Sequence, residues 1–392
     1  MTSGEAGETP GLDPAIDRVP LGESLGEPRW GRRSPGGREA GFGNDRGGPT
    51  YAALDLGTNN CRLLVARPAG DGFRVVDAFS RIVRLGEGIS ASGRLSEAAI
   101  DRSIEALEIC RNKMRNRGVT RARLIATEAC RAAENGAEFR ARVSEKLGLA
   151  LEVIDRETEA ALAATSCTPL IDPEAEGVVL FDIGGGSSEL VRLDRSPRCN
   201  RGPPLPRIRG WISLPHGVVT LAERHGGHNV TRDTYEAMVA EVAELIAPFA
   251  REYGQGLHGE GLHGVHMLGT SGTVTTIAGV HLDLKRYDRN RIDGCWLEAG
   301  DIDAVLERLV AMSYDERVAS PCIGADRADL VLAGCAILEA IRRAFPCPRL
   351  RVADRGLREG MLVQMMREDG AWGEGGADGA DGAEGGGQAA LS

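Results

Sequence analysis

The residues best suited to chemistry lie within residues 178–193, VVLFDIGGGSSELVRL. An apolar run leads into Asp182, glycines and serines follow, and a second apolar run comes after Glu189. This pattern predicts a strand, a tight turn and a second strand. Backbone N–H groups of a glycine turn can close on phosphate oxygens while the aspartate holds a cation, although a plain hairpin is the alternative. The predicted phosphate-binding residues are Gly184, Gly185, Gly186, Ser187 and Ser188.

Two further stretches point to the same chemistry. Residues 51–65, YAALDLGTNNCRLLV, again run from an apolar strand through Asp55 into a turn and a second strand, which indicates a duplicated unit. Residues 268–280, LGTSGTVTTIAGV, place small residues between a strand and a helix, where free N–H groups and the helix dipole favour an anion. The alternative for this stretch is a helix start built from small residues. The phosphate-binding residues predicted here are Gly57, Thr58, Asn59, Asn60, Gly269, Thr270, Ser271, Gly272 and Thr273.

The order of predicted elements repeats along the chain. Three strands, a helix, a strand, a helix, a strand and a helix occupy residues 50–175, and the same order starts again at residue 178. Such a repeat is typical of α/β proteins with two ribonuclease H-like domains, the actin-like ATPase fold. We expect domains over residues 50–175 and 176–368, with an interdomain cleft and a last helix that can pack back on the first domain. Residues 1–49 and 369–392 have the composition of disordered tails.

In this fold the two aspartates approach each other across the cleft. One carboxylate each from Asp55 and Asp182 suits Mg²⁺, usually with intervening waters. The alternative is that each aspartate stabilises its own turn.

Composition excludes several classes of function. A net charge of −10 and a pI near 5.4 argue against a general nucleic-acid or membrane-surface binder. No apolar run approaches the roughly 20 residues that cross a bilayer, and residues 1–14 do not resemble a secretory signal, so we expect a cytoplasmic protein. The nine cysteines form no C-x-x-C pair and predict neither disulfides nor a zinc site. No P-loop sequence is present.

Eight stretches together resemble one family. They are LDLGTNNCRLLV, VRLGEGISASGRLSEAAI, ATEACRAAENGAEF, VIDRETEAAL, LFDIGGGSSELV, SLPHGVVTLAER, GTSGTVTTIAG and VADRGLREGML, and they span about residues 51–368. In this order they are similar to the exopolyphosphatase and guanosine pentaphosphate phosphohydrolase family. The resemblance implies Mg²⁺-dependent hydrolysis of a terminal phosphoanhydride in polyphosphate or guanosine pentaphosphate.

The resemblance also implies roles for single residues. Glu159 matches the base that activates water; the alternative is that Glu157 and Glu159 are acids favoured by the helix dipole. Because the two lie on different helix faces, we expect only Glu159 in the cleft. Arginines are expected to bind phosphate oxygens. The remaining family positions are Arg131 and Arg62 facing the phosphate chain, Asp182 as metal ligand and Glu189 as support for the metal.

The chain departs from the family pattern in a few places. Asn60 replaces a usual serine, and Ala161 stands where an arginine is common, which could weaken chain binding or shift substrate preference. The chain ends soon after VADRGLREGMLV, so we do not expect the additional helical domains that support long-chain digestion and dimer contacts. The sequence leaves open whether the protein forms a homodimer. Two other functions stay open: a binding module that senses guanosine tetraphosphate or pentaphosphate without turnover, and an actin-like sugar or acetate kinase.

Overall fold

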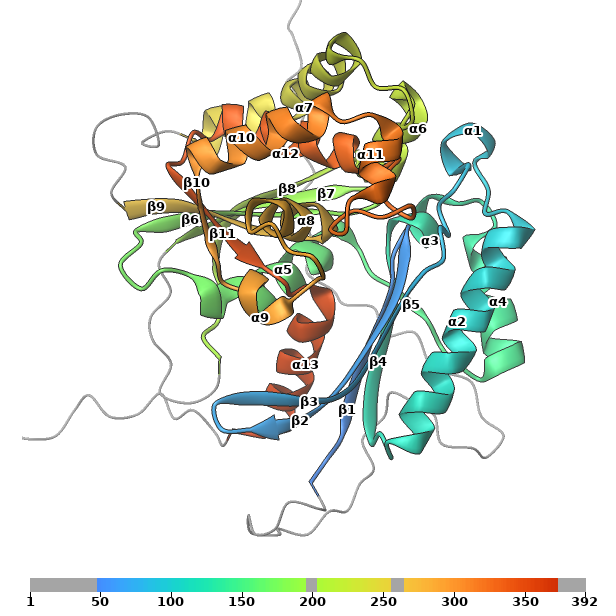
Figure 1. Ribbon diagram of the computed structural model, residues 1–392. Coiled ribbons are helices and arrows are strands. Elements are labelled where there is room, and N and C mark those ends of the chain that lie inside the picture. The colour runs from blue at the N-terminus through green and yellow to red at the C-terminus, as the bar shows by residue number, and fades with distance from the viewer. Residues whose placement is uncertain (1–47, 195–202, 255–263, 373–392) are drawn as a thin grey trace, which may run out of the picture.

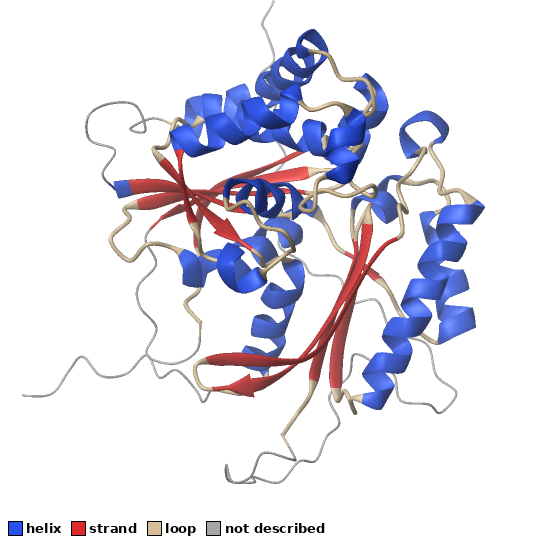
Figure 2. Ribbon diagram, in the orientation of Figure 1, coloured by secondary structure: helices blue, strands red, loops and turns tan. Residues whose placement is uncertain are grey.

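A computed structural model describes residues 48–194, 203–254 and 264–372 of the 392-residue chain. Two sheets organise these residues, and they stand at a steep angle to each other (Figures 1 and 2). Residues 1–47, 195–202, 255–263 and 373–392 lie outside the described residues, so the prediction of disordered tails is not tested over them. No helix in the described ranges is long and apolar enough to cross a membrane.

The first sheet has the strand order β3-β2-β1-β4-β5. Antiparallel pairing joins β1, β2 and β3, whereas β4 and β5 run parallel to β1. Alternation along β1 sends Ala52 and Leu54 into a core with α2 and α4, and Tyr51 and Ala53 into a core with α13. The strands are β1 (Tyr51–Leu56), β2 (Asn60–Ala69), β3 (Gly72–Ile82), β4 (Arg121–Ala126) and β5 (Glu152–Val153). The helices of this half are α1 (Ile89–Ser92), α2 (Glu97–Asn116), α3 (Glu128–Ala132), α4 (Gly136–Leu147) and α5 (Arg156–Cys167), followed by the 3₁₀ turn η1 (Thr168–Leu170).

The second sheet has the order β10-β11-β9-β6-β7-β8 and repeats the antiparallel hairpin followed by a parallel strand. Val179 and Phe181 of β6 face the core under α7 and α12, whereas Val178 and Leu180 face α5. The strands are β6 (Gly177–Ile183), β7 (Ser188–Asp194), β8 (Arg207–Leu214), β9 (Val265–Thr270), β10 (Trp296–Glu298) and β11 (Arg349–Ala353). The helices are α6 (Val218–His225), α7 (Arg232–Tyr253), α8 (Gly272–His281), α9 (Arg289–Ile292), α10 (Ala299–Ala311), α11 (Tyr314–Ala319), α12 (Val331–Ala344) and α13 (Leu357–Glu368).

Two helices fill the space between the sheets. Leu162 and Ala163 of α5 pack on α13, and Ala160 and Ala164 pack on the second sheet. Gly360 lets α13 approach closely, because a Cβ there would lie 2.3 Å from the carbonyl oxygen of Leu162. The last helix thus packs on the first sheet, although it follows the last strand of the second.

The residues after α13 differ from the expected tail. Asp369 accepts a hydrogen bond from the Tyr51 hydroxyl at 3.0 Å, and Trp372 Nε1 donates to the Gly72 carbonyl oxygen at 3.0 Å. Residues 369–372 therefore pack on the first sheet rather than belonging to a tail, because these two polar groups find partners there.

Most expected elements are present, with one displaced boundary. The sequence predicts a helix from Asp326 to Ala344, but α12 begins only at Val331, and residues 325–330 form turns. These turns aim Arg327 at the space between the sheets and Asp329 at Arg84 of the other half. No helix was expected from the sequence at α1, α3, α6, α9, α10 or α11.

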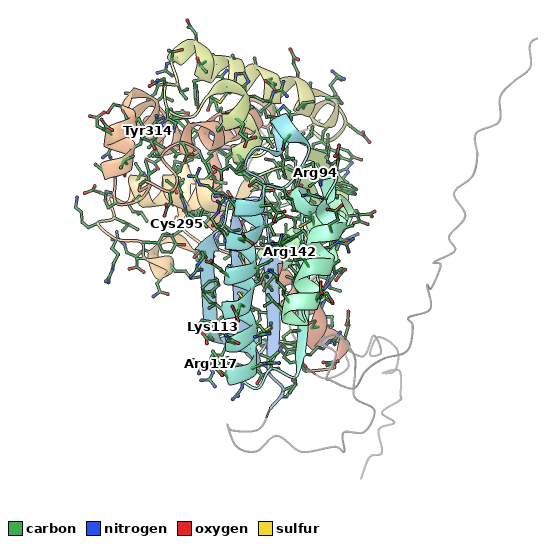
Figure 3. The ribbon with its side chains drawn as sticks, turned by 90° about the vertical axis from the view of Figure 1, so that its right-hand side faces the viewer. Arg94, Lys113, Arg117, Arg142, Cys295 and Tyr314 are labelled. Atoms are coloured by element: carbon green, nitrogen blue, oxygen red, sulfur yellow. The ribbon has the colours of Figure 1, made fainter. Side chains whose placement is uncertain are left out.

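Ion pairs cover the outer face of the first half. Lys113 and Arg117 of α2 both contact Asp77, and Arg142 of α4 contacts Glu97 (Figure 3). Lys113 and Arg117 thus share one carboxylate, whereas Arg142 also pairs with a second acid, Asp101.

Candidate active site

A cavity of about 140 Å³ lies between the two sheets. Three turns and the start of α13 form its walls: the β1–β2 turn, the β6–β7 turn, the β9–α8 turn and residues 355–358. Of the residues predicted from sequence, the lining includes Asp55, Gly57, Thr58, Asn59, Asn60, Arg62, Glu159, Asp182, Gly184, Gly185, Gly186, Ser187, Thr270, Ser271, Gly272 and Thr273.

The two glycine turns touch each other across this cavity. A Cβ at Gly186 would lie 2.7 Å from Thr58 Oγ1, and one at Gly185 would lie 3.0 Å from Thr58 Cβ. The first turn is closed by a hydrogen bond from Gly57 N to Asn60 O at 2.9 Å, and the second by one from Gly184 N to Ser187 O at 2.9 Å. Side chains at these glycines would push the turns apart, so the close approach explains the glycines directly.

The first residues of α6 and the loop before them support the second glycine turn from behind. Val218 N donates to Gly184 O at 2.9 Å, and Val219 N donates to Gly185 O at 2.8 Å. Ser188 is not among the lining residues; its hydroxyl donates to the carbonyl oxygen of His216 at 2.7 Å. Ser188 therefore anchors the supporting loop.

The third turn carries local backbone strain. Ser271 has a φ of 117°, and its hydroxyl accepts from Thr273 N at 3.2 Å at the start of α8. A non-glycine residue with positive φ is costly and tends to occur at functional sites. Gly269 is not among the lining residues, and its missing side chain leaves room for Phe181, whose ring carbon would lie 2.5 Å from a Cβ there.

Four acids with raised pKa values gather at this site. Burial and the Asp55 carboxylate raise the pKa of Asp182 to about 6, and burial also raises that of Asp55. Burial and Asp182 raise the pKa of Glu189 to about 7, although Glu189 is not among the lining residues and accepts from Ser213 Oγ at 2.8 Å. Burial and Glu189 raise the pKa of Glu159 well above the ordinary value, and Arg131 partly offsets this.

The aspartates are the residues most able to hold a cation. Asp55 Oδ1 is buried and has no hydrogen-bond partner within the described ranges, and Asp182 adds a second, half-buried carboxylate nearby. Because two carboxylates repel, a cation between them would stabilise both. The described residues contain no group of three or more His, Cys, Asp or Glu side chains arranged around a metal position, so Glu189 does not complete a direct ligand set.

Glu159 and Glu157 point in different directions, as their spacing predicts. Glu159 is 8% exposed, whereas Glu157 is exposed at the surface. Arg131 Nη2 donates to Glu159 at 3.1 Å and to Glu128 at 2.6 Å. Arg131 also donates to the carbonyl oxygen of Ile154, so its guanidinium is engaged in holding acids and backbone.

Arg131 was expected to bind phosphate oxygens, and its contacts among the described residues are with two acids and one backbone carbonyl oxygen. It is not among the lining residues and instead lies behind Glu159 and Glu128. Glu128 holds the Arg131 guanidinium in this position, because it accepts hydrogen bonds from Nε and Nη2 of Arg131. Glu128 also accepts a hydrogen bond from Arg156 at 3.0 Å.

Three cavity arginines were missed by the sequence analysis. Arg327, Arg355 and Arg358 line the cavity beside Arg62. Burial and the positive charge of Arg358 lower the pKa of Arg62. Arg355 and Arg358 lie in VADRGLREGML, a stretch that resembles the family but whose arginines were given no function. No sequence motif marked Arg327.

Two mixed α/β halves, each with a hairpin and parallel strands, meet at a cavity lined by the turns of both, which gives the actin-like fold that the sequence predicts. The model of the Ppx/GppA phosphatase family matches residues 64–369. The chain belongs to the Ppx/GppA phosphatase family.

Solved structures agree with this family. The Aquifex aeolicus family member is 28% identical with a TM-score of 0.66, covering 82% of this chain and 98% of its own. An exopolyphosphatase-like protein is 27% identical with a TM-score of 0.71, covering 81% of this chain and 99% of its own. An exopolyphosphatase from Cytophaga hutchinsonii is 23% identical with a TM-score of 0.72, covering 81% of this chain and 98% of its own, and supports the fold.

Proposed function

We propose that this phosphatase releases the terminal phosphate of inorganic polyphosphate, guanosine pentaphosphate or both. The observation that carries the proposal is Glu159, a buried carboxylate fixed by Arg131 in the wall of the cavity, with both glycine turns among the other walls. A base beside a phosphate-binding surface is the arrangement that phosphoanhydride hydrolysis needs.

The cavity can bind a polyanion although the chain has a net charge of −10. Arg62, Arg327 and Arg358 line it together with the N–H groups of the turns. These fixed donors act in a partly buried site, where attraction for phosphate oxygens is stronger than in water.

The two aspartates are suited to Mg²⁺. Asp55 and Asp182 would hold the ion, with waters completing its shell and Glu189 supporting Asp182. When bound, the ion would neutralise charge on the phosphate oxygens.

Glu159 would orient a water toward the terminal phosphorus and accept its proton. Burial and the neighbouring Glu189 raise its pKa, which makes its ionised form a stronger proton acceptor than an exposed glutamate. The hydrogen bond from Arg131 keeps the carboxylate in one orientation, so Arg131 acts on the reaction through Glu159.

The test replaces the base without changing its shape. With Mg²⁺, Glu159→Gln should release phosphate about 10²- to 10⁴-fold more slowly than the wild type, with substrate binding retained. Glu157→Gln is the matched control, because this acid lies two residues earlier and is exposed. Equal turnover in Glu159→Gln and the wild type would refute the role of Glu159. No release from either substrate by the wild type, together with tight guanosine tetraphosphate binding, would favour a sensor.

A further inference from the structure

A cluster of one carboxylate and two imidazoles lies behind the second glycine turn. Glu241 of α7 contacts His216 Nε2 through Oε1 at 2.5 Å and His225 Nε2 through Oε2 at 2.7 Å. His216 lies two residues before α6, and His225 is the last residue of that helix. One side chain of α7 therefore holds both ends of α6. None of the three side chains is among those that line the cavity.

The carboxylate of this cluster is ionised. Burial raises the pKa of Glu241, but the hydrogen bonds from His225 and His216 outweigh burial and hold that pKa below its usual value. A carboxylate can only accept, so both imidazoles donate through Nε2. The Arg224 guanidinium lies 3.1 Å from the same carboxylate, but Arg224 is exposed, and exposed ion pairs contribute little. The two histidine contacts therefore hold the cluster together.

The His216 ring is 8% exposed, and packing alone does not explain it. Its Nδ1 is buried and has no hydrogen-bond partner among the described residues. A buried polar atom without a partner costs free energy, which an apolar side chain of similar size would avoid. What the imidazole adds at this position is the contact of Nε2 with Glu241.

The backbone around His216 supports the second glycine turn. The carbonyl oxygen of His216 accepts from Ser188 Oγ at 2.7 Å, and the next residue, Gly217, packs on Gly185. The first two residues of α6 then donate to carbonyl oxygens of the turn at 2.9 and 2.8 Å. A displacement of His216 is therefore passed on to the backbone of the turn.

The other end of α6 lies near the first half of the molecule. Glu223 accepts a hydrogen bond from Gly88 N at 2.8 Å, and α6 lies between α7 and α1 in Figure 1. Glu223 is two residues before His225, so the contact of His225 with Glu241 holds the end of α6 that touches the first half.

We infer that Glu241 is a positioning residue for phosphate binding: through His216 and His225 it fixes α6, and α6 fixes the N–H groups of the second glycine turn. This inference rests on the proposed function, in which those N–H groups bind phosphate oxygens. Glu241 itself is not among the lining residues, so its effect on the reaction passes through the turn.

A double-mutant cycle tests this inference with tripolyphosphate as substrate. Glu241→Ala and His216→Phe should each raise KM about 10- to 100-fold with a smaller change in kcat, because a displaced turn binds phosphate less well before and during the reaction. A loss of folded enzyme would instead lower kcat and leave KM unchanged. The double variant should have nearly the KM of Glu241→Ala, because both changes remove one contact. Glu244→Ala is the matched control, since this acid is exposed on the same helix.

Amide hydrogen exchange separates this inference from the proposed function, because it requires no turnover. Residues 184–187 and 217–221 should exchange faster in Glu241→Ala than in the wild type or in Glu244→Ala, whereas residues 57–60 of the first turn should not change. This result supports the inference even where the wild type releases no phosphate. Unchanged exchange at the second turn, equal acceleration in Glu244→Ala, or additive losses in the double-mutant cycle overturn it.

Discussion

The pKa values of the acids at this site are raised because like charges are buried close together. Asp55, Asp182, Glu189 and Glu159 all have raised pKa values, and burial is the largest cause for each. An acid whose pKa is higher in the folded state than in the unfolded state binds protons more tightly when folded. Its burial therefore costs nothing at low pH and destabilises the fold as the pH rises. A bound cation would remove this cost.

Asp182 makes that cost measurable. A pKa raised from 3.8 to about 6 corresponds to about 3 kcal/mol. In EDTA, we therefore expect the wild type to lose stability relative to Asp182→Asn as the pH rises from about 4 to 7.5. The free energy of unfolding of the variant minus that of the wild type should increase by an amount that approaches about 3 kcal/mol. Urea unfolding at several pH values measures the difference, and Mg²⁺ at pH 7.5 should raise the stability of the wild type more than that of the variant. A difference that does not change with pH would contradict the assignment.

At the scale of elements, the glycine turns depend on the loop that supports them. Gly217 packs on the second turn, where a Cβ would lie 2.3 Å from the carbonyl carbon of Gly185. This contact is with backbone, which cannot rotate away as a side chain can. The loop therefore determines where the N–H groups of the turn point.

Gly217→Ala should displace the second glycine turn while leaving the fold intact. Overpacking of this kind costs about 1–3 kcal/mol of stability, and a shift of about 1 Å in the turn should lower kcat/KM about 100-fold. Phosphate-release kinetics and thermal unfolding measure both effects. Gly300→Ala is the control, because a Cβ there meets nothing within 4 Å. Wild-type kinetics in Gly217→Ala would show that the turn does not depend on this contact.

Local patterns predicted the elements of the site better than its long-range contacts. The strand–glycine–strand pattern gave both turns, and helix periodicity separated Glu159 from Glu157, because each depends on neighbours in sequence. The protein contacts of Arg131 could not be predicted, since its direction depends on Glu128 and on the carbonyl oxygen of Ile154. Arg327 enters the cavity only because residues 325–330 form turns instead of helix.

At the scale of the whole molecule, the two halves are joined across the cavity by a few polar contacts. Arg84 Nη1 donates to Asp329 Oδ2 at 2.9 Å, and its Nη2 donates to Asp326 O at 3.2 Å. Gly88 N donates to Glu223 Oε1 at 2.8 Å. These contacts run from the loop after β3 to the second half, beside the turns that carry Arg327. They favour a closed arrangement in which the turns of both halves act on one ligand.

Arg84→Ala should weaken this closure and raise KM several-fold with a smaller effect on kcat, because the substrate must then bring the halves together itself. The ion pair is part-exposed, with 32% and 17% of its side chains accessible, so the wild-type KM should rise with salt more than that of the variant. Small-angle X-ray scattering of the free proteins should show a larger radius of gyration for Arg84→Ala. Arg94→Ala is the matched control, since Arg94 pairs with Glu134 and Glu138 inside the first half (Figure 3). If Arg84→Ala and Arg94→Ala behave alike in scattering and KM, the Arg84–Asp329 pair does not hold the halves together, and closure rests on the packing of α5 and α13 between the sheets.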